Sequence, residues 1–155
     1  MRDEPTPAEE AWALLERLLV PQRLRFLEIA AELGLHPAQQ GALMALEEGV
    51  SLPMHELATR LHCDSSNVTG IVDRLEQRGL VERRPHDQDR RVKLIVLTAR
   101  GAEVRHGVRR RMREVPAVLL AMRPEDQSAL RDIMRRAFGH SAAVSITDWD
   151  MPVAQ

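Results

Sequence analysis

The sequence predicts a mainly α-helical protein with one small β-hairpin. Apolar residues recur at helical spacing over most of the chain. Two short stretches between residues 80 and 98 are instead rich in Val, Ile and Leu and flank a polar turn. Aromatic residues make up only 3% of the chain, so the core must be built from aliphatic side chains, which suit helix packing.

Composition limits the class of protein. At 155 residues the chain has the size of one domain with a sizeable core. No apolar run approaches ~18 residues, so no transmembrane helix is expected. The acidic N-terminus, MRDEPTPAEE, lacks the apolar core of a secretion signal. The single cysteine, Cys63, cannot form an internal disulfide and fits a reducing compartment. We therefore expect a cytoplasmic protein that has no membrane partner.

The first part of the chain predicts two helices. Residues 8–33 have helical periodicity, and Gly34 would end this helix. Pro21 lies within it and would either kink one long helix or start a second. The next helix is expected to have Pro37 at its first position and Gly49 after its end.

Two further helices are expected at about 54–62 and 65–78. Asp64 is a favourable N-cap for the second, because its carboxylate can accept free amide hydrogens of the first turn. That helix has an apolar stripe at i, i+3, i+4 and i+7, formed by Val68, Ile71, Val72 and Leu75. A connection of about three residues between two short helices is typical of a helix-turn-helix.

A β-hairpin and further helices complete the chain. The stretches LVERR and VKLIVLT are predicted strands on either side of the polar tip PHDQDR. Thr98 would cap a long helix reaching about Met122, which Pro116 could kink, and Pro124 would start a final helix. Residues 139–155 show no periodicity and are expected to form a loose tail, although Trp149 could dock. The stripe of the long helix would comprise Val104, Val108, Met112, Val115 and Leu119.

A helix-turn-helix followed at once by a hairpin is a winged helix. Its second helix lies in the major groove of DNA, with the N-terminal residues nearest the bases. The start of the 65–78 helix carries more short polar side chains than a cap requires, and Arg74 follows within reach of a phosphate. The alternative is that these side chains only cap the helix. They are Ser65, Ser66, Asn67 and Thr69.

Charge is distributed unevenly along the chain. Residues 1–56 carry 4 Arg and 10 Asp or Glu, whereas residues 74–113 carry 13 Lys or Arg and 5 Asp or Glu. A clustered basic segment indicates a polyanionic partner, although a solvated charged face would show the same pattern. Within the hairpin, arginines could enter a minor groove, and Asp87 and Asp89 would support the turn. The arginines are Arg83, Arg84, Arg90 and Arg91.

The stretches HPAQQGALMAL, HELATRLHCDSSNVTGIVDRLEQRGLVERR and DRRVKLIVLTARG resemble the MarR family of bacterial transcription regulators. The resemblance runs in order from about Glu9 to Phe138. It implies a winged helix-turn-helix with N- and C-terminal dimerisation helices, in a single compact domain overall. The implied parts are a dimerisation helix in 1–35, a DNA-binding lobe in 36–98, dimerisation helices in 99–138 and a tail in 139–155.

The resemblance also implies a function. The chain is expected to be a sequence-specific regulator, most simply a repressor, that binds double-stranded DNA at a palindromic operator as a homodimer. A small-molecule effector, of unknown identity, would bind between the dimerisation helices and the DNA-binding lobe. Carried over by position, the recognition-helix residues are Ser65, Ser66, Asn67, Thr69, Gly70 and Arg74. The wing residues are Arg84, Arg90 and Arg91, with Asp89 as the acidic residue that supports the wing.

The chain departs from the family pattern at two positions. Many members have glycine in the turn where this chain has His62, which adopts a positive φ less readily. Relatives often carry a long basic side chain where this chain has Gly70. Cys63 is expected to be a small buried side chain and no redox sensor. His36 and His106 are expected to be exposed or capping.

No enzymatic activity, cofactor or metal is expected. We find no nucleophile–base pattern, glycine-rich phosphate loop or paired-carboxylate motif. The stretch HELATRLH departs from the zinc-protease spacing H-E-x-x-H. Its His55 and His62 would lie roughly 10 Å apart along a helix, too far to share one ion.

Three alternatives remain open. The winged helix could dock another protein through its wing, in which case DNA would be indifferent to Arg90 and Arg91. The chain could be an enzyme that uses its winged helix only to dimerise, but 155 residues leave little room for a catalytic domain. It could also be a nonspecific architectural DNA binder, with steep salt dependence and little sequence preference.

Overall fold

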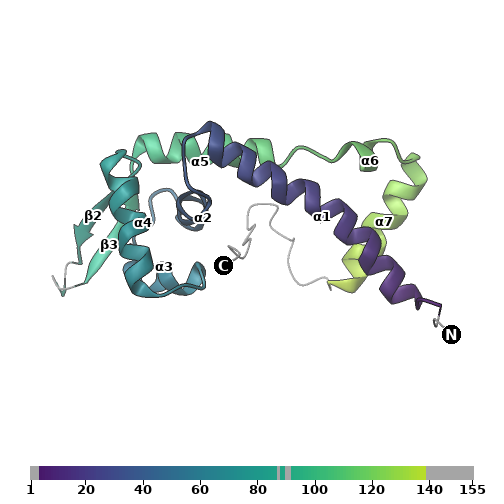
Figure 1. Cartoon of the computed structure of the whole chain (residues 1–155), viewed down its shortest axis with the longest axis horizontal. Helices are drawn as coiled ribbons and strands as arrows, with labels where there is room; N and C mark the ends of the chain where they lie inside the picture. Colours follow the sequence, from purple (N-terminus) through teal and green to yellow (C-terminus); the bar gives the residue numbers. More distant parts are fainter. Residues whose placement is uncertain (1–3, 87, 90–91, 139–155) are drawn as a thin grey trace. The chain divides into compact units, whose positions relative to one another are not determined.

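The computed structural model describes residues 4–86, 88–89 and 92–138, apart from the side chain of Ser65 (Figure 1). The chain separates into two compact units, the first reaching Met112 and the second beginning at Arg113. The expected tail, with Trp149, lies outside the described residues. The fold is mainly helical with one small antiparallel sheet, which confirms the predicted fold class.

Helix α1 spans Pro7–Glu32 and begins with a reciprocal pair of hydrogen bonds. The hydroxyl of Thr6 accepts the N–H of Glu9 at 3.3 Å, and the Glu9 carboxylate accepts the Thr6 N–H at 2.7 Å. Hydrogen bonds from Thr6 lower the pKa of the Glu9 carboxyl below its usual value. The helix continues through Pro21, so the single-helix alternative is correct. Gly34, at φ +62°, follows its end as predicted.

Three short helices follow: α2 (Pro37–Ala45), α3 (Met54–Arg60) and α4 (Ser65–Gln77). Helix α2 ends before the predicted stop at Gly49, because Leu46 is already extended and its side chain is fully buried. Gly79, at φ +67°, follows the C-cap of α4 and ends the helix as predicted.

The sheet has the strand order β1-β3-β2, and both pairs of strands are antiparallel. Strands β2 (Val81–Pro85) and β3 (Lys93–Leu97) form the predicted hairpin and lie side by side next to α4 (Figure 1). Strand β1 (Leu52–Pro53) was not predicted. Two residues, one of them proline, cannot display the alternation by which a strand is recognised in a sequence.

The main core lies among α2, α3, α4 and the sheet and is aliphatic, as expected from the composition. A smaller cluster of Ile29, Val108 and Met112 joins the end of α1 to α5. Most apolar side chains of α1 are left uncovered by the chain itself. Those more than a third exposed are Trp12, Leu14, Leu19, Val20, Leu24 and Leu27.

Helix α5 spans Ala99–Met112. The hydroxyl of Thr98 accepts the N–H of Gly101 at 3.0 Å, which confirms Thr98 as the cap. The prediction that this helix reaches Met122 was wrong, because Pro116 lacks an amide hydrogen and disfavours helical backbone before it.

The second unit contains α6 (Ala117–Leu120) and α7 (Pro124–Ala137), which starts at the predicted proline. The Gln127 amide donates to the carbonyls of Leu119 and Met122 and thereby ties the two helices together. None of the helices in the described ranges is long and apolar enough to cross a bilayer.

The packing of Gly101 against the backbone of Leu80 predicts a large effect of one added methyl group. A Cβ at Gly101 would lie 1.9 Å from the carbonyl oxygen of Leu80, whereas one at Gly107 on the same helix would meet nothing within 4 Å. We expect Gly101→Ala to lower the free energy of unfolding by about 3 kcal/mol through overpacking. Gly107→Ala is the matched control and should raise it by about 1 kcal/mol. Urea denaturation at one protein concentration measures both, and an unchanged midpoint for Gly101→Ala would contradict this packing.

Candidate nucleic-acid interface

The turn between α3 and α4 has the tight geometry of a helix-turn-helix. His62 adopts φ +50°, the left-handed conformation expected at this position. The N–H of Cys63 donates to the carbonyl of Ala58 at 3.2 Å and closes the turn. Asp64 occupies the N-cap of α4 as predicted, but its side chain makes no capping hydrogen bond. The expected side-chain cap is therefore wrong, although the start of the helix is right.

Helix α4 is divided into a buried apolar side and an exposed polar side. Val68, Val72 and Leu75 are fully buried, and Ile71 is half-buried. All predicted recognition residues of α4 except Ser65 are exposed. The side chain of Ser65 lies outside the described residues. These exposed residues are Ser66, Asn67, Thr69, Gly70 and Arg74.

Beside the exposed side of α4 lies an open hollow of about 1270 Å³. Its lining comes from α4, α3, the turn and the start of α2. The hollow brings Ser66, Asn67, Gly70 and Arg74 together on one surface, and their contact with DNA stays a prediction.

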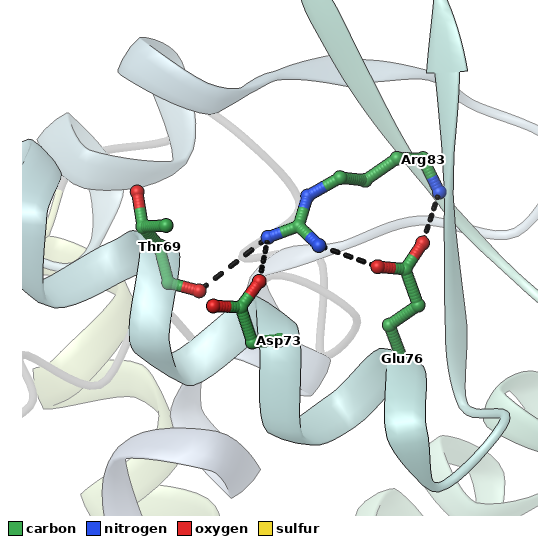
Figure 2. Close-up of polar contacts among 4 residues, drawn as sticks. All are labelled: Thr69, Asp73, Glu76 and Arg83. Atoms are coloured by element: carbon green, nitrogen blue, oxygen red, sulfur yellow. Dashed lines mark hydrogen bonds and ion pairs between the residues drawn. The ribbon is translucent and has the colours of Figure 1, made fainter.

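Arg83 cross-links strand β2 to α4. Its guanidinium lies between the carboxylates of Asp73, at 2.5 Å, and Glu76, and it also reaches the carbonyl of Thr69 at 3.4 Å (Figure 2). The Glu76 carboxylate accepts the backbone N–H of Arg83 at 3.0 Å as well. The sequence grouped Arg83 with the exposed arginines of the hairpin, and this was wrong. Its side chain is 21% exposed and is bound by two carboxylates of α4.

A spacing in the sequence could have revealed this network. Asp73 and Glu76 are three residues apart, so both side chains lie on the same face of α4. The hairpin then brings a basic residue back to that face, since β2 follows α4 after a short turn. Opposite charges placed this way form an ion pair between two elements.

The wing is described only in part. Arg84 is exposed and pairs with Glu82 on the same strand. Asp89 is exposed, and its carbonyl accepts the N–H of Val92 at 2.9 Å. The support that its side chain is expected to give a wing arginine stays a prediction. Asp87, Arg90 and Arg91 lie outside the described residues.

The other end of α4 is attached to α1. The guanidinium of Arg78, the C-cap residue of α4, donates to the carbonyls of Leu33, at 2.8 Å, and Gly34. These carbonyls close the end of α1, whose last turn contains no basic residue of its own. The sequence gives no local signal for this role of Arg78, because the contact joins residues more than 40 positions apart.

The cysteine and two of the histidines noted in the sequence take part in core packing, a helix cap and a charge pair. Cys63 is half-buried and packs against the main core. The Nδ1 atom of His36 caps α2 by accepting the N–H of Ala38 at 3.3 Å, and His106 is exposed beside Glu48. Within the described residues, no three His, Cys, Asp or Glu side chains are grouped so that they could hold a metal ion.

The comparisons with known proteins concern this same region. A sequence model of the MarR family matches residues 35–93, from α2 to the first residue of β3. The HTH-type transcriptional repressor MdtR of Bacillus subtilis is 37% identical over 87 residues, which are 56% of this chain and 56% of MdtR. The uncharacterized HTH-type transcriptional regulator YwoH of Bacillus subtilis is 31% identical over 103 residues, 66% of this chain and 74% of YwoH. The chain belongs to the MarR family.

The fold of this MarR protein agrees with that of solved relatives. A MarR family protein from Bacillus stearothermophilus is 28% identical, with a TM-score of 0.69, and the match covers 83% of this chain and 91% of that one. The chain spans between half and two thirds of the length of several curated relatives that it matches. The winged-helix fold implied by the resemblance is thereby confirmed.

The Arg83 network predicts a loss of stability when its centre is removed. We expect Arg83→Gln to lower the free energy of unfolding by about 1–3 kcal/mol, because Asp73 and Glu76 lose their shared cation. A double-mutant cycle with Glu76→Gln should give a coupling free energy of about 1 kcal/mol. The matched control Arg84→Gln removes an arginine that is 60% exposed and should change stability by less than about 0.5 kcal/mol. Equal effects of the two substitutions would contradict the assigned role of Arg83.

Burial predicts low reactivity of the Cys63 thiol. Desolvation, followed by the negative charge of Asp64, raises the pKa of this thiol above its ordinary value. At pH 8 a smaller fraction is therefore thiolate, and Cys63 should react with iodoacetamide more slowly than free cysteine does. The rate should rise with pH, and Asp64→Asn should increase it modestly at pH 8. A rate equal to or above that of free cysteine at pH 8 would be inconsistent with this environment.

Proposed function

We propose that this chain is a sequence-specific DNA-binding transcriptional regulator, which represses by covering a palindromic operator as a homodimer. The observation that carries the proposal is the division of α4, whose apolar side is buried while its polar side lies open beside a wing. A helix divided in this way can enter the major groove without disturbing its packing. The family membership and the names of MdtR and YwoH support a regulatory role.

In this proposal each part of the surface has a role. Ser65, Ser66, Asn67 and Thr69 reach base edges or phosphates from the leading end of α4, and Arg74 binds a phosphate further along. Arg84, Arg90 and Arg91 contact DNA from the wing, and Asp89 supports the wing. The backbone at Gly70 faces the DNA without a side chain.

The homodimer is supported by the uncovered apolar side chains of α1. Six large apolar residues of this helix are 40–57% exposed in the single chain, an arrangement typical of a surface that another protein covers. A second copy would bury them and place two α4 helices on half-sites about 10 bp apart. A small-molecule effector would release DNA by changing the separation of these helices, through a coupling of about 1–3 kcal/mol.

The first test is a fluorescence-anisotropy titration at two salt concentrations. One probe is the intergenic DNA beside the gene itself, and the other is a scrambled sequence of equal length. We expect the natural probe to bind at least ~10³-fold more tightly at moderate salt. Equal and weak binding of both probes would contradict specific regulation at that site and favour a protein partner. Equal and tight binding with a steep salt slope would favour an architectural DNA binder.

Two substitutions on α4 test its role in that binding. Arg74→Ala should weaken binding about tenfold and reduce the salt slope by about 0.9, the value of one phosphate contact. Gly70→Arg should strengthen binding, because a Cβ there meets nothing within 4 Å and the new guanidinium can reach the backbone. Arg123→Ala, an exposed arginine of the second unit, is the control and should leave binding unchanged. If Arg74→Ala binds like the unchanged protein, α4 is not the recognition helix.

A further inference from the structure

The carboxyl end of α1 is a junction between three helices. The guanidinium of Arg78, the C-cap residue of α4, donates to the carbonyls of Leu33, at 2.8 Å, and Gly34. Arg111 of α5 forms an ion pair at 2.7 Å with Glu32, the last residue of α1. Leu33 packs against the main core and also against the smaller cluster that joins α1 to α5. The end of α1 is therefore held by α4 and by α5.

The contact of Arg78 is suited to fix a direction. Its guanidinium donates through Nη2 to Leu33 and through Nη1 to Gly34, so one planar group binds two successive carbonyls. These carbonyls carry the negative partial charge of a helix end, and the last turn of α1 has no basic residue of its own. A charged donor strengthens both bonds, and two bonds from one rigid group restrict orientation as well as distance.

A second attachment of α4 follows directly after Arg78. The hydroxyl of Thr98, which caps α5, donates to the carbonyl of Gly79 at 2.7 Å. The N–H of Thr98 donates to the carbonyl of Leu80 at 3.1 Å. The carboxyl end of α4 is thus attached to α5 after the helix and to α1 through Arg78. One attachment alone would let α4 tilt about it, whereas attachments to two different helices fix its direction.

Helix α1 is the helix through which two copies pair in the proposed homodimer. Its uncovered apolar side chains extend to Leu27. The backbone of Leu33 lies six residues further along, about 9 Å at the rise of an α-helix. In a homodimer, the direction of α4 relative to α1 would therefore determine how far apart the two recognition helices lie.

We propose that Arg78 is a positioning residue, which sets the separation of the two recognition helices by holding α4 in a fixed direction at the end of α1. The inference rests on the proposed homodimer and adds to it a residue outside the DNA-contacting set. Asn67 lies about 16 Å from Arg78 along α4, so a tilt of about 10° at that end displaces it by about 3 Å. Because one base pair rises by about 3.4 Å, Arg78 also selects the half-site spacing that is bound.

The first experiment measures the distance between the recognition helices in the full chain without DNA. A spin label is attached to Asn67→Cys in a Cys63→Ala background, since Cys63 is the single cysteine of the chain and Asn67 is exposed. Double electron–electron resonance then measures the distance between the two labels of a homodimer. We expect one narrow distribution for this reference protein. With Arg78→Met added, the mean should shift by at least about 3 Å or the distribution should become at least about twofold broader.

Two variants separate positioning from stabilisation of a helix end. Arg60→Met is the matched control, because the Arg60 guanidinium also donates to a carbonyl at the end of a helix, that of Ala45 in α2, at 3.0 Å. This contact joins α3 to α2 and does not involve the end of α1, so the distance distribution should stay unchanged. Arg78→Lys returns a charged donor to the carbonyls of Leu33 and Gly34 and should restore most of the reference distribution.

The second experiment measures the preference for half-site spacing with the native residues at positions 63 and 67. The probe is the DNA that binds in the titration above, with the centre of its footprint unchanged, lengthened by one base pair or shortened by one. We expect the unchanged protein to bind the two altered spacings at least about tenfold more weakly, and Arg78→Met to reduce this difference to about threefold or less. Lower stability alone would weaken binding to all three duplexes by the same factor.

The outcomes that overturn the proposal differ from a failure of the proposed function. If Arg78→Met leaves the distance distribution unchanged, Arg78 does not position α4, while the homodimer stands. If Arg60→Met changes the distribution as much as Arg78→Met does, the effect is a general loss of packing. If the reference protein shows no dipolar coupling between labels, no homodimer forms, and the proposed function fails together with this inference. Far-UV circular dichroism confirms that each variant is folded, and the shorter Arg78→Gln replaces Arg78→Met if it is not.

Discussion

The guanidinium of Arg83 bridges the carboxylates of Asp73 and Glu76 and fixes the wing against α4, and the geometry of the exposed surface depends on it. A hairpin of two five-residue strands has little core of its own, so its orientation must be set by a neighbouring element. The guanidinium supplies this link through directed hydrogen bonds as well as charge. Because Arg83 is bound by α4, the exposed arginine of the described part of the hairpin is Arg84.

Three sides of helix α4 have different environments. One side is fully buried in the core, a second carries the two carboxylates that bind Arg83, and a third is open to the hollow. The buried side explains why the open side can carry short polar residues with low helix propensity, such as Ser66 and Asn67. Packing through Val68, Val72 and Leu75 stabilises the helix, so the exposed positions are available for recognition.

Local sequence signals predicted much of the fold. The end of α1 at Gly34, the Thr98 cap of α5, the start of α7 at Pro124 and the hairpin all follow from local signals in the sequence. Two of the failures arise from contacts between different elements, and a third has a local cause. Strand β1 is defined by its pairing with β3, and the environment of Arg83 is defined by another element. The long helix predicted through Pro116 failed for a local reason, since the effect of proline on the residue before it was given too little weight.

Several predicted site residues of α4 lie on one open surface, and their contacts with DNA stay a prediction. Periodicity places the polar residues of α4 on one side, and the structure leaves that side uncovered. Which histidines line the hollow with them could not be predicted, because His36 and His55 belong to other elements that only the tertiary fold places there. The same holds for Arg78, whose partners Leu33 and Gly34 are more than 40 positions away in the sequence.

The attachment of Arg78 to the end of α1 has a mechanical consequence. Together with Arg83, it joins α4 to two neighbours, so side-chain hydrogen bonds link the end of α1, α4 and the hairpin in series. A rotation of α1 would then turn α4 as well. In an assembly of two such chains, switching would require only a small swing of each body about the axis of assembly. The displacement of α4 would then grow in proportion to its distance from that axis.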